Sequence, residues 1–130
     1  MDTKIISSVG QAQIKYKCPV SGFQKIAGGK HKLRILWALR KGPAHYGDLK
    51  RASAMFSEFT MDARVFTREL SLLRESGLID KKLVSGNVRK TEYSLTPLGE
   101  SMVPVLETIC NWSLTNLDII VPEGNACIDP

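Results

Sequence analysis

The sequence has no long apolar run, few cysteines and only two histidines. No segment approaches the roughly 20 consecutive apolar residues that a membrane-spanning helix needs, so we expect no membrane partner. The N-terminus also lacks the apolar stretch of a secretory signal peptide, which favours a cytoplasmic protein. The three cysteines, Cys18, Cys110 and Cys127, lie far apart along the chain. This spacing argues against a disulfide scaffold and against a zinc site built from paired cysteines.

Sequence motifs of the common enzyme classes are absent as well. There is no phosphate-binding glycine loop, no nucleophile elbow and no pair of carboxylates that stands out as an acid–base couple. His31 and His45, taken together with Cys18, match no compact metal-ligand spacing. We therefore expect neither an enzyme nor a bound metal or cofactor.

The chain does have enough hydrophobic residues for one folded domain, and it carries an excess of positive charge. Its 130 residues are 43% hydrophobic, and this length is close to the commonest domain size. The net charge of +5 is a modest attraction for polyanions such as nucleic acid. The distribution of the charge is more informative, because seven of the 18 Lys and Arg lie between Arg64 and Lys90, against three acidic residues.

The chain from Asp62 to Gly77 predicts an amphipathic helix. Asp62 can cap its N-terminus, and Gly77 suits the left-handed residue that ends many helices. Phe66, Leu70 and Leu73 recur at helical spacing and should face the core. The opposite arc carries polar and basic side chains, namely Arg64, Thr67, Arg68, Ser71 and Arg74. Such side chains can contact base edges and phosphates of DNA, and an ordinary solvated face is the alternative.

Two short strand-like runs, 78–84 and 90–95, follow this helix, with Ser85-Gly86-Asn87 between them as a turn. Basic residues flank the turn, and Arg89 is the one nearest its tip. A helix with a basic outer face followed by a hairpin with a basic rim is typical of a recognition helix and its wing. We therefore predict that six residues contact DNA: Arg64, Thr67, Arg68, Ser71, Arg89 and Lys90.

The remaining pattern completes the order of a winged helix-turn-helix. We expect a short helix that ends at Gly28-Gly29, a central buried helix over 30–41, a short strand near 44–46 and a helix over about 47–54. The fold class is thus mainly α with a small β hairpin and extra helices at both ends. The predicted domain organisation is an N-terminal arm over 1–17, a winged helix-turn-helix domain over 18–121 and a flexible tail over 122–130.

A long final helix is predicted to start at Thr96, which can cap it, and Pro97, which fits the first helical position. Pro104 falls inside this helix and should kink it or fix its first turns. The helix carries more apolar residues than one small core needs, and we expect five of them to form a homodimer interface: Val105, Leu106, Ile109, Trp112 and Leu117. A two-fold dimer would match a pseudo-palindromic DNA site.

Several motifs, in their order and spacing, resemble the HxlR-type regulators, a branch of the MarR-like winged-helix transcription factors. They are Cys18-Pro19-Val20, Gly28-Gly29-Lys30, Ile35-Leu36, Gly42-Pro43, Asp48-Leu49, Leu70 with Leu73, Gly77-Leu78, Glu92-Tyr93-Ser94-Leu95-Thr96-Pro97, Gly99 and Trp112. The sequence departs from the family at His31, where a tryptophan is usual, and at the wing turn, where prolines are usual.

The resemblance implies a homodimer that binds operator DNA, and often a cysteine near the N-terminus that senses oxidants or electrophiles. It makes Cys18 the candidate redox-sensing residue, while Cys110 on the apolar stripe of the last helix suits packing. The leading hypothesis is therefore a dimeric regulator that binds double-stranded DNA. A winged-helix module that binds protein is the alternative, because this fold serves either purpose.

Overall fold

The structure is a computed structural model that describes residues 18–54, 61–84 and 90–120. The elements are α2 (Pro19–Ala27), α3 (Lys32–Leu39), β1 (Ala44–His45), α4 (Tyr46–Ala54), α5 (Ala63–Glu75), β2 (Ile79–Leu83), β3 (Thr91–Leu95), α6 (Pro97–Glu100) and α7 (Val103–Ile120). Up to the end of β3, their order is the predicted one. The predicted arm over 1–17, the tail over 122–130, the wing turn and Arg89 lie outside the described residues.

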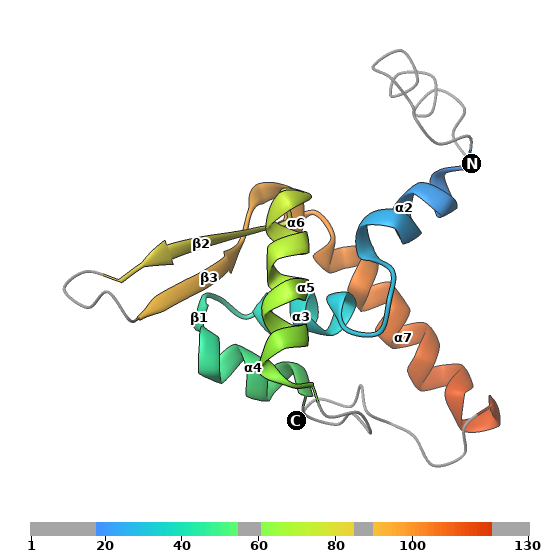
Figure 1. Cartoon of the computed structure of the whole chain (residues 1–130). Helices are drawn as coiled ribbons and strands as arrows, with labels where there is room; N and C mark the ends of the chain where they lie inside the picture. Colours follow the sequence, from blue (N-terminus) through green and yellow to red (C-terminus); the bar gives the residue numbers. More distant parts are fainter. Residues whose placement is uncertain (1–17, 55–60, 85–89, 121–130) are drawn as a thin grey trace.

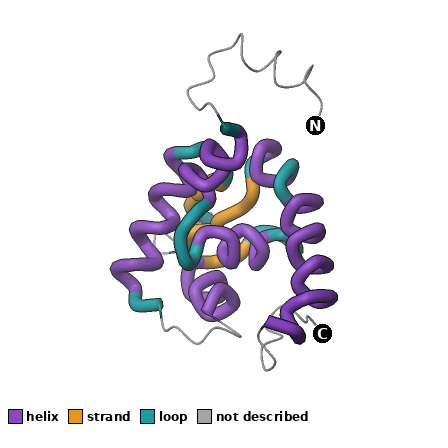
Figure 2. The backbone as a smooth tube through the Cα atoms, turned by 90° about the vertical axis from the view of Figure 1, so that its right-hand side faces the viewer, coloured by secondary structure: helices purple, strands orange, loops and turns teal. Residues whose placement is uncertain are grey.

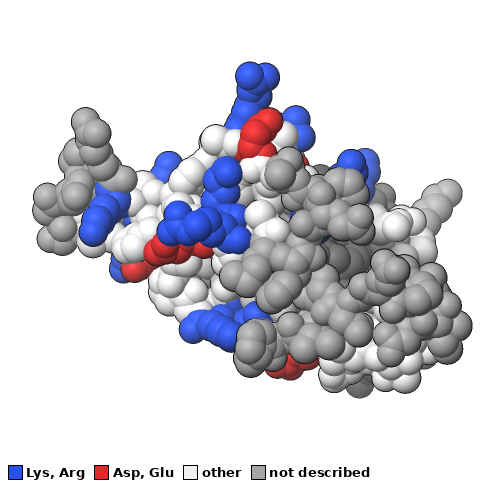
Figure 3. Space-filling view, turned by 90° about the horizontal axis from the view of Figure 1, so that it is seen from below, with Lys and Arg blue, Asp and Glu red and all other residues white. Residues whose placement is uncertain are grey.

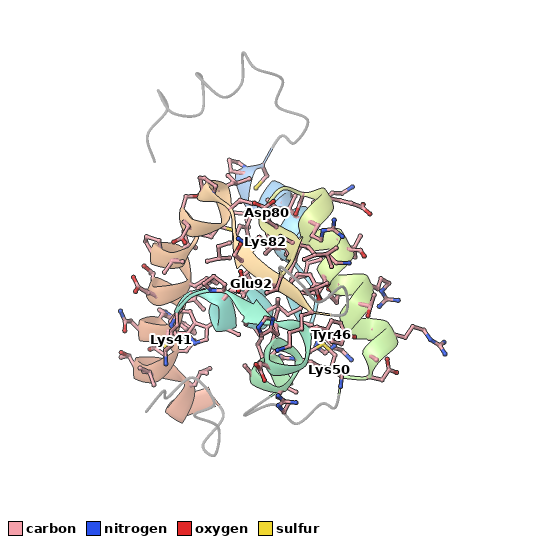
Figure 4. All side chains as sticks on the ribbon, turned by 90° about the vertical axis from the view of Figure 1, so that its left-hand side faces the viewer. Lys41, Tyr46, Lys50, Asp80, Lys82 and Glu92 are labelled. Atoms are coloured by element: carbon pink, nitrogen blue, oxygen red, sulfur yellow. The ribbon has the colours of Figure 1, made fainter. Side chains whose placement is uncertain are left out.

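Helix α3 is the centre of the fold. Ile35, Leu36 and Leu39 are buried, because apolar residues surround much of its circumference. The helix contacts α4, α5, α7 and β3. Figures 2 and 4, which are seen from opposite sides, both show a long helix on each flank of the molecule, and the colours of Figure 4 identify these two helices as α7 and α5. The predicted central buried helix is thus confirmed.

The sheet has three antiparallel strands in the order β1-β3-β2. Strand β1 pairs Ala44 with Tyr93, and β2 pairs Ile79 with Leu95 and Leu83 with Thr91. Among the described residues of strands β2 and β3, Ile79 and Tyr93 are the ones buried in the core. Strands β2 and β3, called the wing from here on, therefore project from the body on the side opposite α2 and α7 (Figure 1).

Helix α5 begins and ends at the predicted residues. The carboxylate of Asp62 accepts a hydrogen bond of 2.9 Å from the backbone N–H of Val65, which satisfies one free amide of the first turn. This hydrogen bond also lowers the pKa of Asp62, so the cap stays ionised to a lower pH than a free aspartate would. Gly77 follows the helix with φ of 81°, a conformation that costs glycine little.

The prediction of a single final helix is wrong, because the chain forms two helices, α6 and α7, after Thr96. Thr96 caps α6 as expected, accepting 3.0 Å from the N–H of Gly99. The chain then turns at Ser101 and Met102, and the buried Met102 packs in the core. Pro104 lies in the first turn of α7, where a helix has no internal partner for an amide proton, so it does not kink a continuous helix.

Candidate nucleic-acid interface

Helix α5 packs on the body of the protein through its apolar face and exposes its polar face to solvent. Phe66, Leu70 and Leu73 are buried in the core cluster. Of the predicted DNA-contacting residues on this helix, Arg64, Thr67 and Arg68 are exposed, and Ser71 is half-buried at the edge. Arg74 is exposed at the C-terminal end, where its charge also complements the helix dipole. The structure thus brings the predicted polar residues of α5 onto one face.

Basic side chains gather around this face and the wing. Seen from below, most of the visible Lys and Arg side chains lie over the half of the molecule that holds the wing and helices α4 and α5 (Figure 3). On the wing, Lys81, Lys82 and Lys90 are exposed. Lys82 lies opposite Glu92 in the register of the two strands, so part of its charge is balanced within the hairpin. Lys90 is the predicted wing contact that the structure describes.

An ion pair anchors α5 to α3. The ammonium nitrogen of Lys32 lies 2.8 Å from the Oε1 atom of Glu69, and their side chains are only 14% and 9% exposed. The second carboxylate oxygen of Glu69 lies 3.8 Å from the guanidinium of Arg68, which is on the exposed face. Glu69 was missed in the sequence because a single acidic residue on a basic, amphipathic helix carries no signal of burial. The pair fixes the orientation of α5 relative to the core.

A second set of contacts joins α5 to α4. The ring of Tyr46 packs edge-to-face on that of Phe66, with 5.1 Å between the ring centroids. Its hydroxyl oxygen lies 2.9 Å from Oγ1 of Thr67 and 3.4 Å from the carbonyl oxygen of Ala63. Figure 4 shows Tyr46 where α4 meets α5, with Lys50 on the same helix. Tyr46 was not among the predicted site residues.

His31 replaces the usual aromatic residue at the start of α3. Its Nδ1 atom accepts a hydrogen bond of 2.7 Å from the guanidinium of Arg34, and Arg34 also donates 3.0 Å to the carbonyl oxygen of Ser53 at the end of α4. Partial burial, with the neighbouring positive charge of Arg34, lowers the pKa of His31. A neutral imidazole can therefore accept this hydrogen bond at neutral pH. Where the family usually has an aromatic residue, His31 thus takes part, through Arg34, in a polar link between α3 and α4.

The predicted dimer residues of α7 divide between two faces. Val105, Ile109 and Trp112 are spaced by four and three residues and form an outward stripe, with exposed fractions of 44%, 40% and 56%. Leu106 instead packs in the core of its own chain and is 5% exposed, because the inner face of α7 contacts α3. Leu117 is partly buried. Of the five predicted dimer residues, the three of the outward stripe therefore keep exposed apolar surface for a partner.

Cys18 is exposed at the N-terminal end of α2 and is a free thiol. The backbone N–H groups of Ser21 and Val20 lower its pKa, since they stabilise the thiolate more than the thiol. Cys110 is a partly buried free thiol on α7. Cys127 lies outside the described residues.

Two further properties concern metals and membranes. Within 18–54, 61–84 and 90–120, no three His, Cys, Asp or Glu side chains come together as a metal site. None of the helices in these ranges has the length and apolar character of a membrane span.

The comparisons with known proteins agree with this geometry. A family model described as HxlR-like helix-turn-helix matches residues 26–120. The HTH-type transcriptional regulator YkvN of Bacillus subtilis (strain 168) is 33% identical over 98 residues, which cover 75% of this chain and 79% of that relative. An HTH-type transcriptional regulator of Methanothermobacter thermautotrophicus is 31% identical over 98 residues, covering 75% of this chain and 71% of its own.

Solved structures of similar fold are also regulators. A MarR-family transcriptional regulator from Porphyromonas gingivalis W83 superimposes with a TM-score of 0.68 at 34% identity, over 79% of this chain and 96% of its own. The redox regulator HypR in its oxidized form gives a TM-score of 0.66 at 25% identity, over 76% of this chain and 97% of its own. These names agree with the expectation that the protein is a regulator and not an enzyme. The chain belongs to the HxlR-like helix-turn-helix family of transcriptional regulators.

Proposed function

We propose that the protein acts as a homodimer that binds a pseudo-palindromic DNA operator in the cytoplasm and regulates transcription from it. The observation that carries this proposal is the outer face of α5. Arg64, Thr67 and Arg68 are exposed together there, on a helix whose other face is locked to the core. The wing, whose strand β2 contacts α5, also carries exposed basic residues.

In the proposed complex, α5 enters the major groove. A guanidinium group such as those of Arg64 and Arg68 can donate two hydrogen bonds to guanine, while the hydroxyls of Thr67 and Ser71 can reach bases or phosphates. Lys90 and Arg89 of the wing contact the phosphate backbone, which positions the protein without selecting sequence.

The dimer is proposed to form through the outward stripe of α7, defined by Val105, Ile109 and Trp112. Burial of this stripe against a second copy would remove its apolar surface from water. A two-fold dimer presents two copies of α5 to two half-sites about one helical turn apart on the duplex. The spacing of the recognition helices is then set by how the two copies of α7 pack.

A response to oxidants or electrophiles through Cys18 is part of the same proposal. Two observations support it, namely the exposure of a thiol whose pKa is lowered and the similarity to a protein named as a redox regulator. Modification of Cys18 adds bulk at the start of α2, which lies on the same side of the molecule as α7 (Figure 1). A change there can alter the spacing of the two recognition helices. This spacing affects DNA binding because both helices must contact their half-sites at the same time.

The test is a titration of the protein with duplex DNA at several salt concentrations. A regulator that neutralises several phosphates loses affinity steeply as salt rises, because bound counterions are released on binding. It also prefers a selected operator over random duplex of equal length. A module that binds protein through this fold would show weak binding and no preference between the two duplexes.

A further inference from the structure

The hydroxyl of Tyr46 joins the first helix of the helix-turn-helix to the exposed face of the second. Tyr46 is the first residue of α4, and it contacts both Thr67 and Ala63 of α5. Its ring is held in place by the edge-to-face contact with buried Phe66. A group on α4 therefore fixes the side chain of Thr67, which lies within the face proposed to meet DNA.

The contact between Tyr46 and Thr67 would by itself allow either hydroxyl to donate, and the contact of Tyr46 with Ala63 favours one of the two arrangements. The carbonyl oxygen of Ala63 can only accept a hydrogen bond, and the phenol has a single proton to donate. Both contacts are fully satisfied when Tyr46 donates to Ala63 and Thr67 donates to Tyr46. In this arrangement, Thr67 keeps a lone pair for an outside partner but has no proton left to donate.

We infer that Tyr46 is a positioning residue that makes Thr67 select an operator base with an exocyclic amino group, which is adenine or cytosine. This inference rests on the proposed function. In the major groove, the amino groups of adenine and cytosine donate hydrogen bonds, whereas O6 of guanine and O4 of thymine accept them. A Thr67 hydroxyl whose proton is held by Tyr46 can accept from the first two groups and cannot donate to the other two.

Removal of the phenol hydroxyl changes this selection without changing the charge of the interface. Tyr46→Phe keeps the ring packed against Phe66 but removes the oxygen that accepts the proton of Thr67. The Thr67 hydroxyl is then free to donate a hydrogen bond to DNA. We expect the preference at one operator base pair to fall about two- to tenfold, the range of one neutral hydrogen bond. Binding to random duplex and its salt dependence stay the same, because no phosphate contact or charge is lost.

The matched variant is Thr67→Val, which has nearly the same shape but no hydroxyl. It should abolish the preference at the same base pair. Adding Tyr46→Phe to Thr67→Val should then change nothing further, because Tyr46 acts only through the Thr67 hydroxyl.

The experiment is a set of binding titrations on operators that carry each of the four base pairs at each position in turn. Wild type, Tyr46→Phe, Thr67→Val and the double variant are compared, and a thermal melt of each confirms the fold. A preference for adenine or cytosine that is lost at one shared position, with no added effect in the double variant, supports the inference. Three results would overturn it: unchanged preferences in Tyr46→Phe, an even loss of affinity for all duplexes, or effects that add. Wild type without any sequence preference would refute the proposed function itself, and the inference with it.

Discussion

We expect the ion pair between Lys32 and Glu69 to be needed for the stable packing of α5 on the core. Glu69→Leu replaces the carboxylate with a side chain of similar volume and leaves the Lys32 ammonium without its partner. Loss of one member of a buried pair costs about 3–5 kcal/mol in general. The lysine side chain here is 14% exposed and can turn towards water, so we expect about 2–3 kcal/mol.

The double variant Lys32→Met, Glu69→Leu should recover most of this loss. Two apolar side chains of similar volume avoid the desolvation of both charges, so we expect its free energy of unfolding to lie within about 1 kcal/mol of wild type. Glu75→Leu is the matched control, because Glu75 is an exposed acid on the same helix. It should leave stability nearly unchanged.

Urea unfolding followed by circular dichroism measures these differences, with all proteins at one concentration because a dimer gains stability with concentration. For a slope of about 2 kcal/mol per M, Glu69→Leu should lower the urea midpoint by about 1–1.5 M. The reasoning is refuted if Glu69→Leu alone unfolds at the wild-type midpoint. It is equally refuted if the double variant is as unstable as the single one.

Three further predictions concern assembly and the redox response. Trp112→Glu places a charge in the outward stripe of α7, and it should sediment as a folded monomer at micromolar concentrations where wild type is a dimer; a wild-type monomer would contradict the proposed interface. Iodoacetamide should alkylate Cys18 with a half-maximal rate at a pH below that of free cysteine, because its pKa is lowered. Diamide or a quinone should change operator affinity in wild type and in Cys110→Ser but not in Cys18→Ser, and an equal response in Cys18→Ser would place the sensor elsewhere.

The features of the fold that depend on local chemistry were predictable from the sequence. Asp62, Gly77 and Thr96 each act on backbone groups within a few residues, so their roles as caps or terminators follow from residue type and position alone. The burial of Phe66 and Leu70 follows from helical spacing in the same way.

The features that depend on distant residues were not predictable. Glu69 is buried because Lys32 lies opposite it, yet the two are 37 positions apart in the sequence. The apolar residues of the last helix gave no sign that the chain breaks at Ser101 and Met102, because both segments carry apolar residues. The same stripe did not separate Leu106, which faces α3, from Trp112, which faces outward.

The candidate site was only partly predictable, because some of its residues depend on local pattern and others on contacts between distant segments. The exposed residues of α5 follow from the helical period once the buried face is known. Tyr46 was missed, because its contact with Thr67 depends on how α4 crosses α5 and not on any local pattern.

The central claim is that α5 is the recognition helix, and an Arg64→Ala, Arg68→Ala double variant tests it most directly. If each arginine contacts a base, each substitution should weaken operator binding by about 1–3 kcal/mol while the fold is kept. Lys25→Ala, which removes an exposed charge from α2 on the side of the molecule opposite the wing, is the control and should bind like wild type. A folded double variant that binds the operator with wild-type affinity would contradict the assignment of α5.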